Sequence, residues 1–269
     1  MNLELTDDVA VVVGGASGIG LAVATAFANE GARVAILDQD SRAPAVAAEL
    51  EERSGRPSLG IVADVANFER VQAAAKLVSA KFGRCDHVVH AAAIGSGKYG
   101  FPFWNLQPQD WPRVLEVNLV GAVNVAHAFA PGFVEARRGT LLFISSVAGQ
   151  IGSQTDPPYS ASKAGLINFA QCAAKDLAPY QVRVNTVCPG MIKTKLNQSV
   201  WEAWNSQQSP ESRTSYENWA DEKVRRVVPL QRWQEAEDIA QFVVFLASPR
   251  AKNITGHTLN VYGGQVMHW

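Results

Sequence analysis

The feature that most constrains the fold of this chain is an alternation of short apolar runs with longer stretches of helical periodicity. VAVVV (9–13) is a continuous β-branched run, typical of a strand buried on both faces. A helical stretch follows and stops at Gly31, a residue type that commonly ends helices, before RVAILD (33–38) supplies a second buried run. The start of the chain therefore predicts a strand, a helix and a second strand parallel to the first.

The same alternation continues almost to the C-terminal end. Successive strands joined by helices form a parallel sheet with right-handed crossovers. The segment 195–228 breaks the rhythm with polar residues and clustered aromatics, and we expect short helices there, lying over an opening. Further strands are expected at 58–63, 87–92, 139–146, 182–187 and 257–264, and helices at 43–54, 67–82, 110–136, 158–179 and 235–248.

Composition argues for a soluble protein and against several functional classes. The chain is 47% apolar with a formal net charge of −1, which allows a sizeable core and indicates no nucleic-acid partner. Its three cysteines, Cys85, Cys172 and Cys188, are widely spaced, which disfavours a disulfide framework or a metal site. The N-terminus lacks a signal-peptide pattern, and no apolar run reaches the ~20 residues of a membrane span. A cytoplasmic protein without a membrane partner is expected.

A glycine-rich loop follows the first predicted strand. Gly14, Gly18 and Gly20 lie between that strand and its helix, where glycines allow a close approach of the backbone to a pyrophosphate. Asp38 ends the second strand and can accept hydrogen bonds from an adenosine ribose, whereas it would repel a 2′-phosphate. The alternative is a structural turn that needs glycine, with Asp38 as an ordinary acid at the end of a strand. The pattern predicts a dinucleotide site that prefers NAD.

The stretch DPPYSASKAG (156–165) places Tyr159 and Lys163 four residues apart on one expected helix face. A free phenol has a pKa of roughly 10, and a nearby ammonium favours the phenolate and lowers that value. Ser146 ends the fifth predicted strand, at the edge where open α/β sheets bind ligands. Each feature also occurs by chance, but together they predict a site that moves a proton to or from a substrate oxygen.

These motifs occur in a characteristic order along the chain. The sequence resembles the single-domain type of the short-chain dehydrogenase/reductase family over essentially its whole length. The resemblance implies a Rossmann-type doubly wound parallel sheet of about seven strands in the order 3-2-1-4-5-6-7, with helices on both faces. It rests on the segments GGASGIG (14–20), ADV (63–65), VNLVG (117–121), ISSVAG (144–149), YSASK (159–163), VNTVCPG (184–190) and ITGHTLNVYGG (254–264).

The family pattern also implies functional residues by position. The catalytic tetrad would be Asn118, Ser146, Tyr159 and Lys163, with Asn118 at a helix kink that holds a proton-relay water. No metal is implied, the cofactor would be NAD, and the assembly would be a homotetramer or a dimer. The implied cofactor contacts are Gly14, Ser17, Gly18, Ile19, Gly20, Asp38, Asp64, Val65, Lys163, Pro189, Gly190, Ile192 and Thr194.

Three positions depart from the family pattern. Val13 stands where the family usually has Thr, and HAAA (90–93) replaces Asn-Asn-Ala-Gly. Because Val13 cannot donate a hydrogen bond, we expect apolar packing to replace a polar contact there, with His90 as a satisfied core or strand-end histidine. Tyr262 replaces an Asp in the last turn, near a usual subunit interface. Ser17 supports NAD, because relatives that prefer NADP often carry a basic residue at that position, and Arg42 is interpreted as a solvated helix-start arginine.

The substrate is expected to bind between Ser146, the loop 94–106 and a lid at about 191–228, within one domain spanning 1–269. The main hypothesis is an NAD-dependent dehydrogenase of a sugar, polyol or other secondary alcohol. A 3-oxoacyl thioester reductase and a non-catalytic NAD-binding sensor are the alternatives. The side chains considered for the pocket are Lys98, Tyr99, Phe101, Phe103, Trp104, Trp201, Trp204 and Trp219, and the amides of Gln150, Gln154, Asn197, Asn205 and Gln207; most of the aromatics are expected only to anchor the lid.

Overall fold

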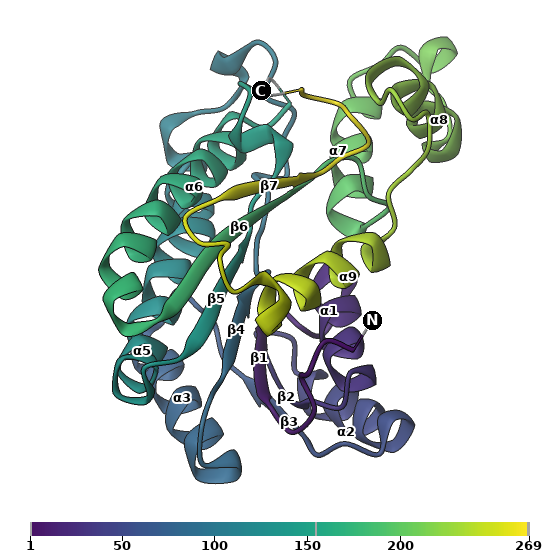
Figure 1. Cartoon of the computed structure of the whole chain (residues 1–269). Coiled ribbons are helices and arrows are strands. Elements are labelled where there is room, and N and C mark those ends of the chain that lie inside the picture. The colour runs from purple at the N-terminus through teal and green to yellow at the C-terminus, as the bar shows by residue number, and fades with distance from the viewer. Residues whose placement is uncertain (1, 154, 268–269) are drawn as a thin grey trace.

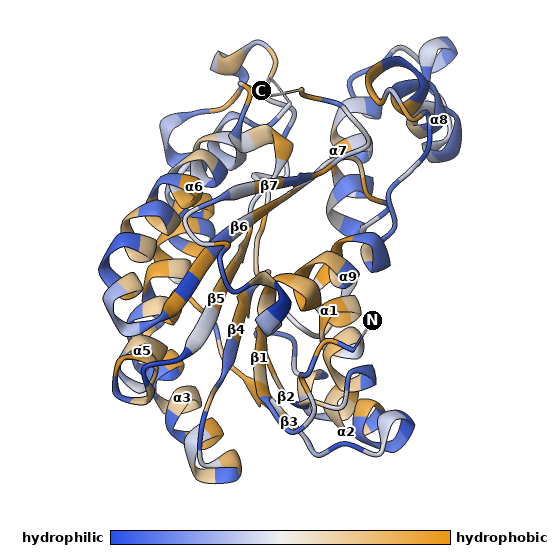
Figure 2. Cartoon of the chain, in the orientation of Figure 1, coloured by the Kyte–Doolittle hydropathy of each residue, from blue (hydrophilic) through white to orange (hydrophobic). Residues whose placement is uncertain are grey.

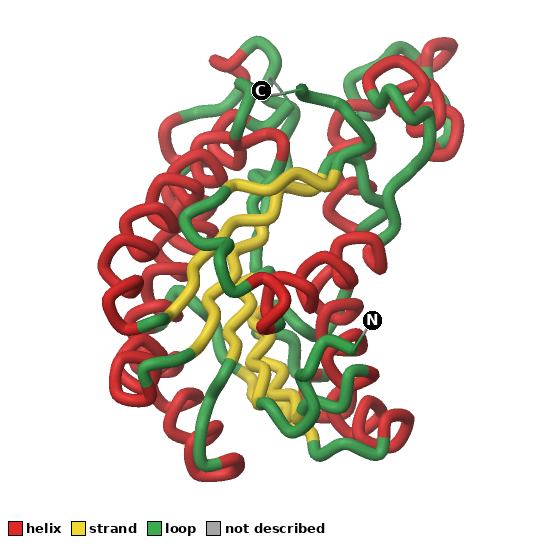
Figure 3. Tube along the Cα trace, viewed as in Figure 1, coloured by secondary structure: helices red, strands yellow, loops and turns green. Residues whose placement is uncertain are grey.

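One parallel sheet of seven strands crosses the part of the chain that this computed structural model describes, residues 2–153 and 155–267 (Figure 3). The strand order is β3-β2-β1-β4-β5-β6-β7, which confirms the predicted topology. From β1 the chain adds β2 and β3 on one side of the sheet and then β4 to β7 on the other side. The strand order therefore reverses between β1 and β4, whose carboxyl ends lie side by side. The strands are β1 (Val9–Val13), β2 (Arg33–Asp38), β3 (Ser58–Val62), β4 (His87–His90), β5 (Gly139–Ile144), β6 (Val182–Pro189) and β7 (Thr258–Val261).

Helices cover both faces of the sheet (Figure 1). One layer contains α1 (Gly18–Asn29), α2 (Ala43–Ser54) and α9 (Ala236–Ala247). The other contains α3 (Phe68–Phe82), α5 (Gly121–Ala136) and α6 (Pro157–Leu177). Short 3₁₀ turns occupy Phe103–Asn105, Pro108–Asp110, Val147–Gly149, Ala178–Tyr180, Pro210–Ser212 and Pro249–Ala251.

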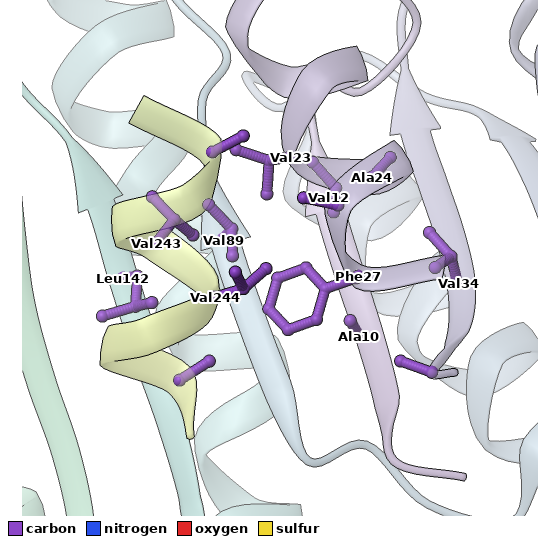
Figure 4. Close-up of a cluster of buried hydrophobic side chains, with 14 of the residues drawn as sticks. Ala10, Val12, Val23, Ala24, Phe27, Val34, Val89, Leu142, Val243 and Val244 are labelled. Carbon is purple, nitrogen blue, oxygen red and sulfur yellow. The ribbon is translucent and has the colours of Figure 1, made fainter. Parts of the chain in front are cut away.

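The core consists of two apolar clusters, one on each face of the sheet. Successive residues of β1 alternate between them: Ala10 and Val12 belong to one cluster, and Val9, Val11 and Val13 to the other. Strands buried on both faces explain the continuous apolar runs in the sequence, which appear as orange strands in Figure 2. In the first cluster the fully buried ring of Phe27 lies between α1, α9 and the sheet (Figure 4).

The helix expected over 110–136 is interrupted. It begins with α4 (Pro112–Leu115), passes through a π-helical turn at Glu116–Val120 and continues as α5. The π turn surrounds Asn118, whose side chain is fully buried and hydrogen-bonded to another segment. The stretch Pro108–Ala136 is long and apolar enough for a membrane span by composition, but much of it packs into the core, and core helices pass the same test.

Several strands end at other residues than predicted. β4 ends at His90 and β5 at Ile144, each two residues before its expected end, whereas β6 runs two residues further, to Pro189. The break in the rhythm at 195–228 contains α7 (Lys195–Asn205) and α8 (Tyr216–Val227), in agreement with the expected short helices. These two helices lie beyond the carboxyl edge of the sheet, at the upper right of Figure 1.

The amino end of the sheet holds a group of five charged or titratable side chains, here called the amino-end charge cluster: Asp8, Arg84, Asp86, His87 and Arg138. Asp86 is almost fully buried and accepts hydrogen bonds from the backbone of Val9 (2.9 Å) and from the guanidinium groups of Arg84 (2.7 Å) and Arg138. Asp8 contacts Arg84 (3.0 Å), Arg138 (3.1 Å) and His87 Nε2 (3.1 Å). Each carboxylate therefore has cationic partners.

Candidate active site

The glycine loop forms a tight cradle between β1 and α1. Gly14 has φ +78°, and a Cβ there would lie 2.6 Å from the backbone nitrogen of Ala92. A Cβ at Gly20 would lie 2.0 Å from the carbonyl oxygen of Gly14. Neither position has room for a larger residue. The N-cap residue of α1, Ser17, makes no side-chain capping bond, so the first N–H groups of this helix are left for a ligand.

Asp38 links the glycine loop to the end of β2. Its Oδ2 accepts a hydrogen bond from the backbone of Ala16 (2.9 Å), and its Oδ1 accepts one from Asp40 (3.0 Å). Arg42 forms an ion pair with Asp40, with Nη2 2.6 Å from Oδ2, and it is not among the residues that line the neighbouring cavity. Asp38 thus presents a carboxylate to the cavity, and the nearest arginine is already paired.

A cavity of about 780 Å³ lies at the carboxyl ends of β1, β4 and β5. It extends from the glycine loop to the first turn of α7. Every predicted cofactor residue lines it: Gly14, Ser17, Gly18, Ile19, Gly20, Asp38, Asp64, Val65, Lys163, Pro189, Gly190, Ile192 and Thr194. Ser146 and Tyr159 line it as well, so residues from distant parts of the sequence meet at one surface.

Tyr159 and Lys163 lie in the first turns of α6, which starts with Asp156 as its N-cap and with Pro157 and Pro158. Lys163 is 1% exposed, and its Nζ donates to the carbonyl oxygen of Ile144 at 2.8 Å. The same Nζ lies 5.6 Å from the centre of the Tyr159 ring. Phenol and ammonium are therefore neighbours, but the ammonium is bonded to the backbone at the end of β5.

The pKa of the tyrosine differs from the expectation. Burial raises the pKa of Tyr159 to about 12, while a hydrogen bond with Ser146 acts in the opposite direction. Burial also lowers the pKa of Lys163 to about 8. The prediction that Lys163 lowers the tyrosine pKa was wrong, because desolvation of the phenolate dominates.

Asn118 lies beneath the cavity and is not part of its lining. Its Oδ1 accepts from the backbone nitrogen of Ile94 (2.8 Å), and its Nδ2 donates to the Ile94 carbonyl (2.9 Å) and to Ser162 Oγ (3.0 Å). The π turn brings this amide to the loop after β4, which supports the helix-kink part of the prediction. Asn118 thereby ties three elements that border the cavity.

The departures from the family pattern are visible in the packing. Val13 and His90 are register partners on β1 and β4, and both are fully buried. Neither ring nitrogen of His90 has a hydrogen-bond partner among the described residues, and the ring packs edge-on against Phe143. Burial, with a smaller effect of the Lys163 charge, lowers the pKa of His90 to about 3. His90 is a core residue as expected, but its nitrogens are not satisfied.

The Tyr262 hydroxyl bonds to Asn260 and to the Val266 carbonyl.

The substrate side of the cavity was predicted only in part. Of the proposed side chains, only Asn197 lines it; Gln154 lies outside the described residues. Trp201 and Trp219 pack against Tyr216, and Trp204 packs against Trp219. The three tryptophans therefore join α7 to α8 within the lid, whereas the alternative interpretation expected them to anchor the lid to the body. Phe101, Phe103 and Trp104 are largely exposed and are not part of the lining, nor are Lys98, Tyr99, Gln150, Asn205 and Gln207.

Asp156 is a cavity residue that the sequence analysis missed. It is 8% exposed, accepts from the backbone of Ser96 (2.8 Å) and Tyr159 (3.4 Å), and so joins the loop after β4 to the start of α6. An acid immediately before two prolines is a helix N-cap signature, which was the available signal. Among the described residues, no group of three or more His, Cys, Asp or Glu side chains could hold a metal ion.

Comparison with known proteins adds independent information. Residues 14–265 match the family model described as enoyl-(acyl carrier protein) reductase. The chain is 34% identical over 266 residues to the 3-oxoacyl-[acyl-carrier-protein] reductase of Synechocystis sp., with 98% of each chain covered. It is 33% identical to the D-threitol dehydrogenase of Mycolicibacterium smegmatis over 264 residues, covering 98% of this chain and 94% of that one.

Solved structures give the same result. The L-sorbose reductase of Gluconobacter frateurii, determined with NADPH and L-sorbose, matches with a TM-score of 0.90 and 28% identity, and the match covers 100% of both chains. Together with the motif order and the cavity, these matches show that the chain belongs to the short-chain dehydrogenase/reductase family, oxidoreductases that interconvert CH–OH and keto groups with a nicotinamide cofactor.

Proposed function

We propose that this protein is an NAD-dependent oxidoreductase of a polyhydroxy alcohol or its ketone, such as a sugar or polyol. The observation that carries the proposal is the position of Asp156 in the wall of the cavity that Ser146 and Tyr159 line. Each carboxylate oxygen of Asp156 accepts one backbone hydrogen bond, which leaves acceptor capacity for substrate hydroxyls. An acyl chain offers no donor to such a group.

The chain's own residues supply binding and proton transfer. Bound at the glycine cradle, the nicotinamide cofactor supplies hydride chemistry. Tyr159 takes the proton from the substrate hydroxyl during oxidation, or returns it to the carbonyl oxygen during reduction. Ser146 holds that oxygen through its hydroxyl. Lys163 contributes a positive charge beside the phenol, and Asn118 maintains the loop that borders the site.

The preference for NAD rests on two side chains. Asp38 faces the cavity at the end of β2, where a carboxylate accepts ribose hydroxyls and repels a 2′-phosphate. Arg42, the arginine that follows Asp38 in the sequence, is paired with Asp40. The L-sorbose reductase of Gluconobacter frateurii is solved with NADPH, so the cofactor is a point on which this chain is expected to differ from a structural relative.

The polyhydroxy substrate class has support from two relatives. D-threitol and L-sorbose, named for the dehydrogenase of Mycolicibacterium smegmatis and the reductase of Gluconobacter frateurii, both carry several hydroxyl groups. The relative from Synechocystis favours a second candidate, reduction of 3-oxoacyl thioesters. The buried Asp156 argues against that candidate, because the carboxylate would face an apolar chain that cannot satisfy it.

The test is turnover followed by reduced-nicotinamide absorbance. Purified protein is given NAD or NADP with a panel of polyols, sugars and simple secondary alcohols, and in reverse with acetoacetyl thioesters and NADH or NADPH. NAD-linked turnover of polyhydroxy compounds, abolished in Tyr159→Phe, supports the proposal. Turnover with NADP alone overturns the interpretation of Asp38. Thioester reduction without polyol oxidation selects the second candidate, and cofactor binding without any turnover selects a sensor.

The proposal extends to organisation. The residues 191–228 act as the substrate lid of a single domain, because Ile192, Thr194 and Asn197 contribute to the cavity from this segment. Exposed apolar residues on the π turn and α5, Val120 and Val123, suit a homotetramer or dimer interface. The three free cysteines suit the reducing cytoplasm.

A further inference from the structure

A hydrogen bond connects the two helices of the lid. The hydroxyl of Tyr216, the first residue of α8, lies 2.8 Å from Oδ1 of Asn197 in the first turn of α7. The backbone nitrogen of Asn197 donates to Thr194 Oγ1 (3.2 Å), the N-cap of the same helix. The main chain and the side chain of Asn197 are therefore both held, and Asn197 lines the cavity.

The tyrosine is in turn held by a group of rings, here called the lid aromatic cluster: Trp201, Trp204, Tyr216, Trp219 and Trp233. The Tyr216 ring lies 5.8 Å from that of Trp201, 6.2 Å from that of Trp219 and 6.5 Å from that of Trp233. Trp233 Nε1 donates to Asp221 at 3.0 Å, which fixes the far side of the cluster. None of these five rings lines the cavity, and the hydrogen bond from Tyr216 to Asn197 connects the cluster to a cavity residue.

The Nδ2 group of Asn197 remains available as a donor at the cavity wall. Burial raises the pKa of Tyr216, so its hydroxyl remains protonated and donates to Asn197 Oδ1 near neutral pH. With Oδ1 occupied, the amide keeps its Nδ2 donors, and Nδ2 has no hydrogen-bond partner within the described residues. A donor held in this way suits a neutral substrate oxygen such as a hydroxyl.

We propose that Asn197 is a specificity-determining residue, whose Nδ2 donates to a substrate hydroxyl remote from the reacting carbon, and that Tyr216 is its positioning residue. This inference rests on the proposed function and deepens it, because it assigns one side chain to the polyhydroxy class of substrate. It predicts that the lid distinguishes a polyol from a simple secondary alcohol of similar size that lacks the remote hydroxyl.

The test compares two substitutions on two substrates. Asn197→Asp keeps an acceptor for Tyr216 but removes the donor, and we expect KM for the polyol to rise roughly tenfold or more, with kcat within about threefold. For the simple alcohol, KM should change less than about threefold. Tyr216→Phe keeps the ring packing and should raise the polyol KM about three- to tenfold. Asn168→Asp on the exposed side of α6 and Tyr180→Phe are the matched controls, and both should behave like wild type.

A double-mutant cycle separates positioning from an independent effect. If Tyr216 acts through the amide, Tyr216→Phe should change the polyol KM less than twofold in the Asn197→Ala background. The inference is overturned if the effects of the two substitutions on the polyol KM multiply independently. It is also overturned if each substitution raises KM equally for the polyol and for the simple alcohol. If wild type oxidises polyols and the variants match the controls, only this inference fails. If wild type oxidises no polyhydroxy compound, the proposed function fails and the inference fails with it.

Discussion

The amino and carboxyl ends of the central sheet both hold buried polar side chains, but in different ways. In the amino-end charge cluster, both carboxylate oxygens of Asp86 accept from an arginine. At the carboxyl end, Lys163 has one carbonyl partner and no ion pair among the described residues, and the His90 ring nitrogens have no partner there. The two ends therefore differ in the pairing of their buried polar groups.

The difference indicates that the amino end of the sheet contributes to stability, whereas the carboxyl end holds groups that can react. At the amino end, the arginine partners of Asp8 and Asp86 compensate the burial of the two carboxylates. At the carboxyl end, burial without full pairing moves the pKa of Lys163 to about 8 and that of Tyr159 to about 12. Groups held in this way cost stability and can exchange protons. Four substitutions, in order of decreasing effect, should separate the two ends.

Tyr159→Phe should leave the fold unchanged and remove the proton-transfer group. We expect kcat/KM to fall by roughly 10³-fold, within the range for loss of a general acid or base. NADH binding, followed by its fluorescence, should stay within about twofold of wild type. Residual turnover within tenfold of wild type would contradict the assignment of Tyr159 as the group that moves the proton.

Asp86→Ala should do the reverse: it should destabilise the protein and spare its activity. The substitution leaves the Val9 N–H without its buried acceptor, while Arg84 and Arg138 are about half exposed and keep Asp8 as a partner. We expect a loss of about 2–3 kcal/mol in the free energy of unfolding. Urea unfolding measures the loss, and kcat is compared at a temperature where the variant is folded. Glu4→Ala, which removes a surface pair with Arg250, is the control and should cost less than about 1 kcal/mol.

Lys163→Met should stabilise the protein while abolishing turnover. The shift of the lysine pKa from 10.5 to about 8 corresponds to a penalty of at most about 3 kcal/mol, and the lost bond to Ile144 offsets about 1 kcal/mol of the gain. The folded-state pKa is below the unfolded value, so the penalty is full below pH 8 and disappears as pH rises toward 10.5. The advantage of the variant should shrink over that window, and a pH-independent difference in urea unfolding would argue against a buried ammonium.

Asp8→Asn should have the smallest effect, present near neutral pH and lost in acid. Burial alone would raise the pKa of Asp8, but the His87 hydrogen bond and the charges of His87, Arg138 and Arg84 hold it below its ordinary value of 3.8. A lowered pKa contributes stability above pH 3.8 that is lost as pH falls through the folded-state value. Wild type should therefore be more stable than the variant near neutral pH and lose that advantage as pH falls below 4. Parallel unfolding curves at pH 3 and 7 would show that Asp8 is not the titrating group.

Much of the fold and the cofactor end of the site could be predicted from local pattern. The run 9–13 is apolar at every position because β1 has core on both faces, and the glycine spacing reflects backbone contacts that exclude a Cβ at Gly14 and Gly20. Such constraints act between residues that are close in sequence, or between motifs that follow one another along the chain in the family order. That is why all predicted cofactor residues line one cavity.

The substrate end could not be predicted in the same way. The presence of aromatic residues in a segment does not show whether their rings line the cavity or pack inside the lid, because the same residue types serve both purposes. The pKa of Tyr159 depends on how deeply α6 places the phenol, which is a tertiary property. Asp156 was visible as a helix cap, but its contact with Ser96 depends on where the loop after β4 returns.

The π-helical turn at Glu116–Val120 bears on the lengths of chain that evolution can accept here. A π turn holds one residue more than an α turn, so a chain shorter by one residue could run as a regular helix and still bury Val125 and Phe129. The shorter chain would lose the two hydrogen bonds between the Asn118 side chain and the backbone of Ile94. The extra residue therefore contributes to the shape of the loop after β4 and is not needed for the packing of the helix that carries it.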